Sequence, residues 1–86
     1  MPEISRFHAL VIQMYFHDHA PPHFHVRHGQ GRARMGIAPV LLLDGTLPPR
    51  LFSLAERWAT LHQAELLDNW QRLARNQPPL PITPLE

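Results

Sequence analysis

The sequence of 86 residues contains no cysteine, so it can form no disulfide, thiolate metal site or cysteine nucleophile. It also contains no lysine, because all eight basic residues are arginine, and this excludes a Schiff-base or phosphate-loop lysine. No apolar run approaches the roughly 20 residues of a membrane-spanning helix, and the N-terminus lacks the basic and apolar segments of a signal peptide. We therefore expect a cytoplasmic protein without a membrane partner, in which histidine and carboxylate are the strongest available metal ligands.

Neither sign of charge predominates in the sequence. The formal net charge is only +1, which by itself does not indicate a nucleic-acid-binding protein. A hydrophobic content of 44% with 17% charged residues is typical of a folded domain, and a chain this short has room for one core. We expect a single domain over residues 1–76 and a proline-rich, extended and mobile tail over residues 77–86.

Residues 9–16 are rich in β-branched and aromatic side chains, which predicts a β-strand. The proline pair Pro21-Pro22 ends this strand, because proline donates no ladder hydrogen bond. The run 40–43, followed by the turn dipeptide Asp44-Gly45, predicts another strand. In the first strand, a period of two places four apolar side chains on one face: Leu10, Ile12, Met14 and Phe16.

Two runs of alternating polar and apolar residues flank Gly29-Gln30-Gly31 and predict a β-hairpin over residues 23–37. Keeping the apolar side chains on one face fixes the register, with Val26 opposite Ala33. The same register pairs Phe24 with Met35, and on the other face His23 with Gly36, His25 with Arg34, and Arg27 with Arg32.

Beyond Pro48-Pro49 the apolar spacing becomes helical. The stripes within residues 51–61 and 66–73 are rotated from each other by roughly a third of a turn, which predicts two helices. The spacing Thr60-x-x-Gln63 resembles a capping box and places the break near residues 60–62. The predicted fold is therefore α+β, an antiparallel sheet of about four strands followed by two C-terminal helices packed on one face.

The chain contains the unusual box Pro21-Pro22-His23-Phe24-His25. Further distinctive segments are Ile4-Ser5-Arg6-Phe7, Met14-Tyr15-Phe16, Asp18-His19, Leu47-Pro48-Pro49-Arg50, Trp58 with Leu61-His62, and Glu65-Leu66-Leu67-x-Asn69-Trp70. Together these segments, over roughly residues 1–75, resemble a bacterial family of small proteins, the domain of unknown function 4160 family. The box is the most specific of them.

The resemblance implies a small stand-alone protein, often encoded beside a second small domain of unknown function. Some members of that family are described as transcriptional regulators or toxin–antitoxin components. Members usually have acidic and lysine-rich segments after the box, whereas this chain has Arg27, His28, Arg32 and Arg34 there. We therefore expect a cationic face that is peculiar to this protein.

Five of the seven histidines lie within residues 17–28, and one hypothesis is that they bind zinc. Histidines two apart on a strand place both imidazoles on one face, where they can share an ion. Three nearby arginines and the scarcity of carboxylates count against a metal site. The candidate ligands are His17, His19, His23 and His25, with Asp18 as an additional one.

A second hypothesis starts from Arg27 opposite Arg32, because two guanidinium groups repel on a sheet face unless an anion lies between them. The anion would be a phosphate-bearing ligand or a nucleic acid. The same face would also suit a metal-independent ribonuclease, with a neutral histidine as general acid or base. The candidate anion-binding residues are His23, His25, Arg27, Arg32 and Arg34.

A third interpretation is structural: the histidines bind loop carbonyls and pack on Tyr15 or Trp58, and the arginines are solvated. The uncovered helical stripe around Trp70 favours a second copy of the chain or a small protein partner. We expect a non-enzymatic interaction protein without a cofactor, a subunit of a small regulatory or toxin–antitoxin-like module whose His/Arg face contacts an anionic partner. The alternatives are a metal-binding protein and a ribonuclease centred on His23 and His25.

Overall fold

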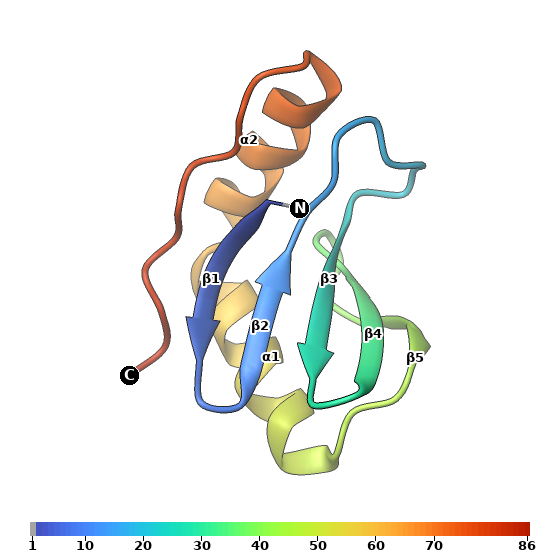
Figure 1. The fold of residues 1–86 in the computed structure, drawn as a ribbon, viewed down its shortest axis with the longest axis vertical. Coiled ribbons are helices and arrows are strands. Elements are labelled where there is room, and N and C mark those ends of the chain that lie inside the picture. The colour runs from blue at the N-terminus through green and yellow to red at the C-terminus, as the bar shows by residue number, and fades with distance from the viewer. Residues whose placement is uncertain (1) are drawn as a thin grey trace.

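The computed structural model describes residues 2–86 and has two layers, a five-stranded antiparallel sheet and two helices that cover one of its faces (Figure 1). The strands lie in chain order across the sheet. This arrangement confirms the predicted α+β fold. The elements are β1 (Glu3–Phe7), β2 (Leu10–Gln13), β3 (His23–His28), β4 (Gly31–Gly36), β5 (Leu42–Gly45), α1 (Pro49–Leu61) and α2 (Gln63–Ala74).

Three strands differ from the prediction. The strand β5 runs from Leu42 to Gly45 rather than over residues 40–43, so Asp44-Gly45 lies within the strand and does not form the predicted turn. The sheet has a fifth strand, β1, which carries a register shift between Glu3 and Ser5 and therefore lacks a regular period of two. The strand β2 ends at Gln13 rather than at residue 16, because the chain turns away and His17 adopts a φ of 54°. Phe16 consequently does not join the core face and is 43% exposed.

The hairpin of β3 and β4 has the predicted register at every position. Its apolar members, Phe24 and Val26 on β3 with Ala33 and Met35 on β4, are all buried. Because side chains alternate across a strand, the polar members point to the opposite face, which the helices leave open at His25, Arg27, Arg32 and Arg34. His23, at the start of β3, is the exception, because it is buried against Trp70 of α2. The hydrophobic pattern thus decides which side of the sheet is available to a ligand.

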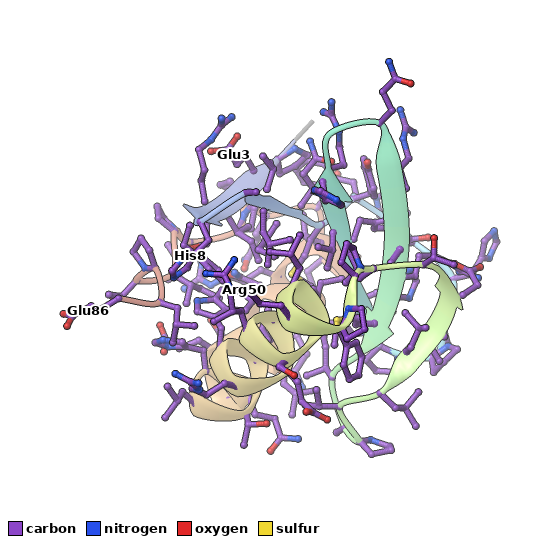
Figure 2. The ribbon with its side chains drawn as sticks, turned by 90° about the horizontal axis from the view of Figure 1, so that it is seen from below. Glu3, His8, Arg50 and Glu86 are labelled. Carbon is purple, nitrogen blue, oxygen red and sulfur yellow. The ribbon has the colours of Figure 1, made fainter. Side chains whose placement is uncertain are left out.

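The core lies between the sheet and the helices, and side chains fill the space there (Figure 2). Trp58 on α1 is fully buried and packs against the rings of Phe7 and Phe24, with centroids 5.3 and 5.8 Å away. Burying aromatic side chains of this size dominates core energetics. The labelled Glu3 and Arg50 in Figure 2 are exposed, so the charged groups stay outside this layer.

The helical segment breaks at His62, within the predicted range. The predicted capping box is wrong, because α2 has no side-chain cap. The Thr60 hydroxyl instead donates to Glu56 O at 2.8 Å, and the Gln63 amide donates to Ile37 O at 2.7 Å. Gln63 therefore ties α2 to the end of the β4 segment. Within residues 2–86, neither helix is long and apolar enough to cross a membrane.

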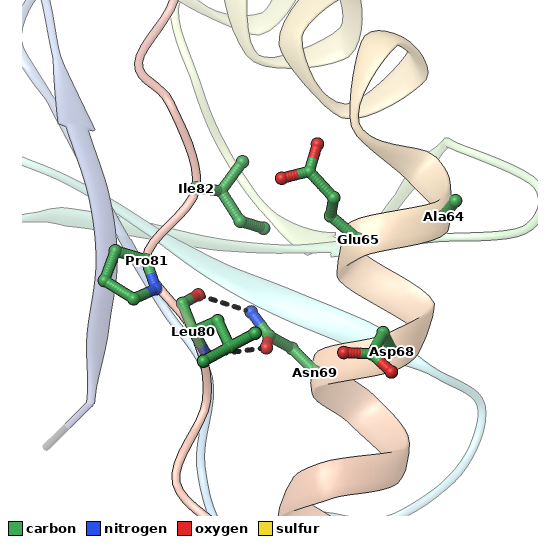
Figure 3. A pocket seen from close by; sticks show the side chains of 7 residues that line it. All are labelled: Ala64, Glu65, Asp68, Asn69, Leu80, Pro81 and Ile82. Carbon is green, nitrogen blue, oxygen red and sulfur yellow. Dashed lines mark hydrogen bonds between the residues drawn. The ribbon is translucent and has the colours of Figure 1, made fainter.

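The tail is extended, as its prolines predict, but it packs against the domain instead of projecting from it. Ile82 is buried and its N–H donates to Ile4 O at 2.8 Å, beside β1. The Asn69 side chain on α2 makes two hydrogen bonds with the Leu80 backbone, of 2.9 and 2.8 Å (Figure 3). These contacts make the tail part of the same core.

Candidate functional site

The open face of the sheet carries a hollow of about 220 Å³ between β2, β3, β4 and β5. We call it the anion hollow. The paired positions His25–Arg34 and Arg27–Arg32 lie along it, directly opposite each other on adjacent strands. Its lining consists of Gln13, Tyr15, His25, Val26, Arg27, Arg32, Ala33, Arg34 and Asp44.

The three arginines of the anion hollow are not equivalent. Arg34 donates from Nε to Asp44 Oδ2 at 2.9 Å, and its second nitrogen contacts the same oxygen. This hydrogen bond lowers the pKa of Asp44, so the carboxylate stays ionised to a lower pH than an ordinary aspartate does. Within residues 2–86, no carboxylate lies within salt-bridge distance of Arg27 or Arg32, and these two charges face each other without compensation.

A second group of polar side chains lies next to the anion hollow. Asp18 Oδ2 is 2.9 Å from His25 Nε2 and 3.0 Å from His23 Nε2. The three potential ligand atoms all lie within 4.8 Å of one another. We call Asp18, His23 and His25 the Asp-His-His cluster; it shares His25 with the anion hollow.

The loop between β2 and β3 positions Asp18. The backbone N–H of His19 donates to Asp18 Oδ1 at 2.9 Å, and this bond leaves Oδ2 facing the two imidazoles. Partial burial acts to raise the pKa of Asp18, but the hydrogen bonds from His25 and from the His19 N–H, with a smaller electrostatic contribution from His23 and His25, lower it overall. Asp18 is therefore held as a carboxylate, the form that binds cations.

His23 is the most enclosed member of the cluster, with 1% of its surface exposed. Its Nδ1 lies 2.7 Å from Pro21 O. Because a carbonyl oxygen only accepts, Nδ1 must carry a proton and donate it. The ring packs against Trp70 of α2, with centroids 5.2 Å apart. Trp70 thus covers the cluster within the same chain.

The remaining histidines of the stretch lie outside the cluster. His17 Nε2 lies 3.3 Å from Asn76 Oδ1, because the left-handed conformation at His17 turns its side chain toward the end of α2. His19 contributes its backbone N–H rather than its ring. Of the four histidines proposed as metal ligands, the structure therefore brings together only His23 and His25, and it joins them with Asp18.

Sequence patterns did not indicate three residues of the anion hollow. Gln13 and Tyr15 line it and contact each other, with Tyr15 Oη 3.3 Å from Gln13 Oε1. Asp44 reaches it because β5 pairs with β4 through a register shift between Arg34 and Met35. The only sequence feature that could have placed Asp44 in the hollow is its charge, which is opposite to that of Arg34. Using this feature requires the β4–β5 register, which the sequence pattern leaves open.

Residues 10–71 of the chain match the family described as Domain of unknown function (DUF4160). The chain belongs to this family. The match to DUF4160 runs from β2 into α2 and includes the Asp-His-His cluster and the anion hollow. It confirms the predicted family and assigns no activity. No curated protein and no solved structure matches the chain.

Proposed function

We propose that this DUF4160 protein is a non-enzymatic, cytoplasmic interaction subunit that binds a phosphate-bearing partner through the anion hollow. The observation that carries this proposal is the uncompensated pair Arg27 and Arg32, which face each other across β3 and β4. Two like charges directly opposite on a sheet destabilise it, and an anion between them turns that cost into attraction. Arginine suits this role because its planar group can donate two parallel hydrogen bonds to phosphate.

The surroundings of the arginine pair support a phosphate-bearing ligand. Tyr15 and the partly exposed His25 add hydrogen-bonding groups at the wall of the hollow, with ring centroids 4.3 Å apart. The lining contains three arginines and one carboxylate. A nucleic-acid backbone or a phosphorylated ligand could use this excess of positive charge.

We further propose that the partner belongs to a small two-component regulatory module of the toxin–antitoxin kind, in which the anion hollow contacts nucleic acid. A second copy of the chain or a small protein partner would complete such a module. The proposal rests on the position of the arginine pair on an open, rigid sheet face, where it is accessible to a large ligand.

The first test is binding of a fluorescent single-stranded RNA, measured by anisotropy over a series of salt concentrations. We expect log affinity to fall linearly with log salt, and Arg32→Gln to reduce that slope by about one. The matched control is Arg57→Gln, which removes an exposed arginine on α1, on the covered side of the sheet. This control should bind as the wild type does.

Three results would contradict the proposal. If Arg32→Gln and Arg57→Gln weaken binding equally, the hollow is not the binding site. If an acidic peptide binds in place of RNA, the partner is not phosphate-bearing. If the RNA is cleaved during incubation with metal-free protein, the protein is an enzyme.

A further inference from the structure

The Asp-His-His cluster contains a contact that a neutral His23 leaves unexplained. His23 Nε2 is buried and makes no hydrogen bond, although Asp18 Oδ2 lies only 3.0 Å away. Since Nδ1 of the same ring carries the proton that Pro21 O accepts, a neutral His23 presents its Nε2 lone pair to a carboxylate oxygen. Two acceptors at this distance repel each other unless a cation lies between them.

We propose that Asp18 Oδ2, His23 Nε2 and His25 Nε2 bind one divalent transition-metal ion of the zinc class. This inference does not rest on the proposed function. Two imidazoles and one carboxylate are an established donor set for zinc and iron(II). Ligand atoms about 2.0–2.1 Å from a tetrahedral ion lie roughly 3.3 Å apart. The two separations from Asp18 Oδ2, 2.9 and 3.0 Å, are close to that edge, and the two imidazole nitrogens lie within 4.8 Å of each other.

The groups around the cluster act as an outer shell for a metal. A histidine ligand usually donates its other ring N–H to a carbonyl or carboxylate, and His23 donates Nδ1–H to Pro21 O. The N–H of His19 donates to the free oxygen of Asp18 and orients the carboxylate. Trp70 packs on the His23 ring and restricts its movement. These contacts therefore already orient two of the three ligands, His23 and Asp18, for binding a metal ion.

The arginine opposite His25 is already paired with a carboxylate of the chain. Arg34, the arginine opposite His25, is paired with Asp44 and is not hydrogen-bonded to Asp18. Three protein ligands leave coordination positions for water or an anionic group. Because His25 also lines the anion hollow, the proposed ion lies at the edge of that hollow.

The experiment uses the untagged full chain, stripped of metal by a chelator and placed in a buffer without phosphate. Zn²⁺ alone is titrated by calorimetry, and the ring nitrogens of the histidines are followed by NMR. We expect one ion per chain, with Nε2 of His23 and His25 shifting together. Co²⁺ in place of Zn²⁺ should give the visible absorption of a low-symmetry site.

The test variants are His25→Ala and Asp18→Asn, each of which removes one ligand. Both should weaken zinc binding at least about 100-fold, because loss of an outer-shell partner alone costs about 10–100-fold. His25 is only partly buried, so its replacement leaves the core intact and decides the question if Asp18→Asn fails to fold. An amide NMR spectrum of each variant checks the fold.

Two control variants remove histidines outside the cluster. His19→Ala deletes a ring beside Asp18 but keeps the backbone N–H that Asp18 accepts. His62→Ala deletes a histidine whose Nδ1 lies 2.6 Å from Glu65 Oε1, a comparable histidine–carboxylate contact that lacks a third ligand. Both controls should bind zinc as the wild type does.

The proposal is wrong if the wild type takes up no zinc, or if Asp18→Asn and His25→Ala bind it unchanged. It is also wrong if both ring nitrogens of His23 carry protons at neutral pH and zinc does not displace one of them. In that case the cluster is a buried ion pair held by a proton.

Discussion

At the scale of single residues, Asp44 controls how much positive charge the anion hollow offers. It is the one carboxylate in the lining and it is bonded to Arg34. Arg27 and Arg32 remain free, so the hollow combines one neutralised arginine with two available ones. Removal of the Asp44 charge should therefore affect binding in the direction opposite to removal of Arg32.

We predict that Asp44→Asn strengthens binding of the RNA probe and increases its salt slope by about one, because Arg34 becomes available to phosphate. The control is Asp68→Asn, which breaks an equally exposed pair with Arg72 on α2, the two aspartate side chains being 54% and 53% exposed. It should leave the slope unchanged. An equal effect of both variants would mean that only net charge matters.

The pKa of Asp44 fixes the conditions of this experiment. The Arg34 hydrogen bond lowers that pKa, so the pair persists from neutral pH down to below the ordinary range of an aspartate, and it is lost only as pH falls further. Binding measured between pH 6 and 8, on either side of the ordinary histidine pKa of about 6.5, therefore compares the variants at constant Asp44 charge.

Residue types alone identified part of the candidate site. The alternation of His25, Arg27, Arg32 and Arg34 could be predicted because a hairpin has a period of two and one apolar face. The ligand set around Asp18 could not, since the choice between His17, His19 and His23 depends on loop dihedral angles such as the positive φ at His17. The residue composition indicates that a metal or an anion could bind here, but the loop conformation decides which side-chain atoms come together as ligands.

At the scale of elements, β5 depends on a glycine. Gly45 has a φ of 83°, and a Cβ there would lie 2.2 Å from Arg32 O on the neighbouring strand β4. This close approach lets β5 pair with β4 and places Asp44 opposite Arg34. The edge of the anion hollow is therefore built on a backbone contact that only glycine permits.

We predict that Gly45→Ala destabilises the domain by more than about 1 kcal/mol and separates β5 from β4. Gly29→Ala is the control, since Gly29 also has a positive φ, of 55°, but has no neighbouring atom within 4 Å of the added Cβ. Urea unfolding of both variants separates the conformational cost from the steric one. Equal destabilisation would show that the close approach to Arg32 does not matter.

The elements also differ in how well the sequence predicted them. The β3–β4 hairpin and the two helices have strong periodic patterns, and their pairing and break point followed from those patterns. The strand β1 was missed because a register shift interrupts its period. The packing of the tail was missed because it depends on Asn69 and on backbone hydrogen bonds to Leu80 and Ile82, which leave no hydrophobic period.

At the scale of the whole molecule, the distribution of charge matters more than its sum. The chain has a formal charge of +1, too small to attract an anion from a distance. The helices and the tail enclose the apolar face of the sheet, and this leaves the His/Arg face as the open side (Figure 1). The fold thus concentrates two unpaired arginines on one accessible surface.

The anion hollow competes with a larger depression for the role of ligand site. That depression has a volume of about 300 Å³ and lies between α2 and the tail, around Glu65, Asp68 and Asn69 (Figure 3). Its two carboxylates would repel a phosphate, and Asn69 is already occupied by the Leu80 backbone. A phosphate-bearing partner should therefore bind in the anion hollow and not in the depression between α2 and the tail.

The most direct test of this account is an NMR titration of the ¹⁵N-labelled wild-type chain, metal-free, with the single-stranded RNA. Amide and side-chain signals of the anion hollow should shift, those of Arg27, Arg32 and Tyr15 most strongly, while α1, α2 and the tail stay unchanged. Shifts confined to the depression around Asn69, or no shifts at low salt, would contradict the assignment of this face as the binding site.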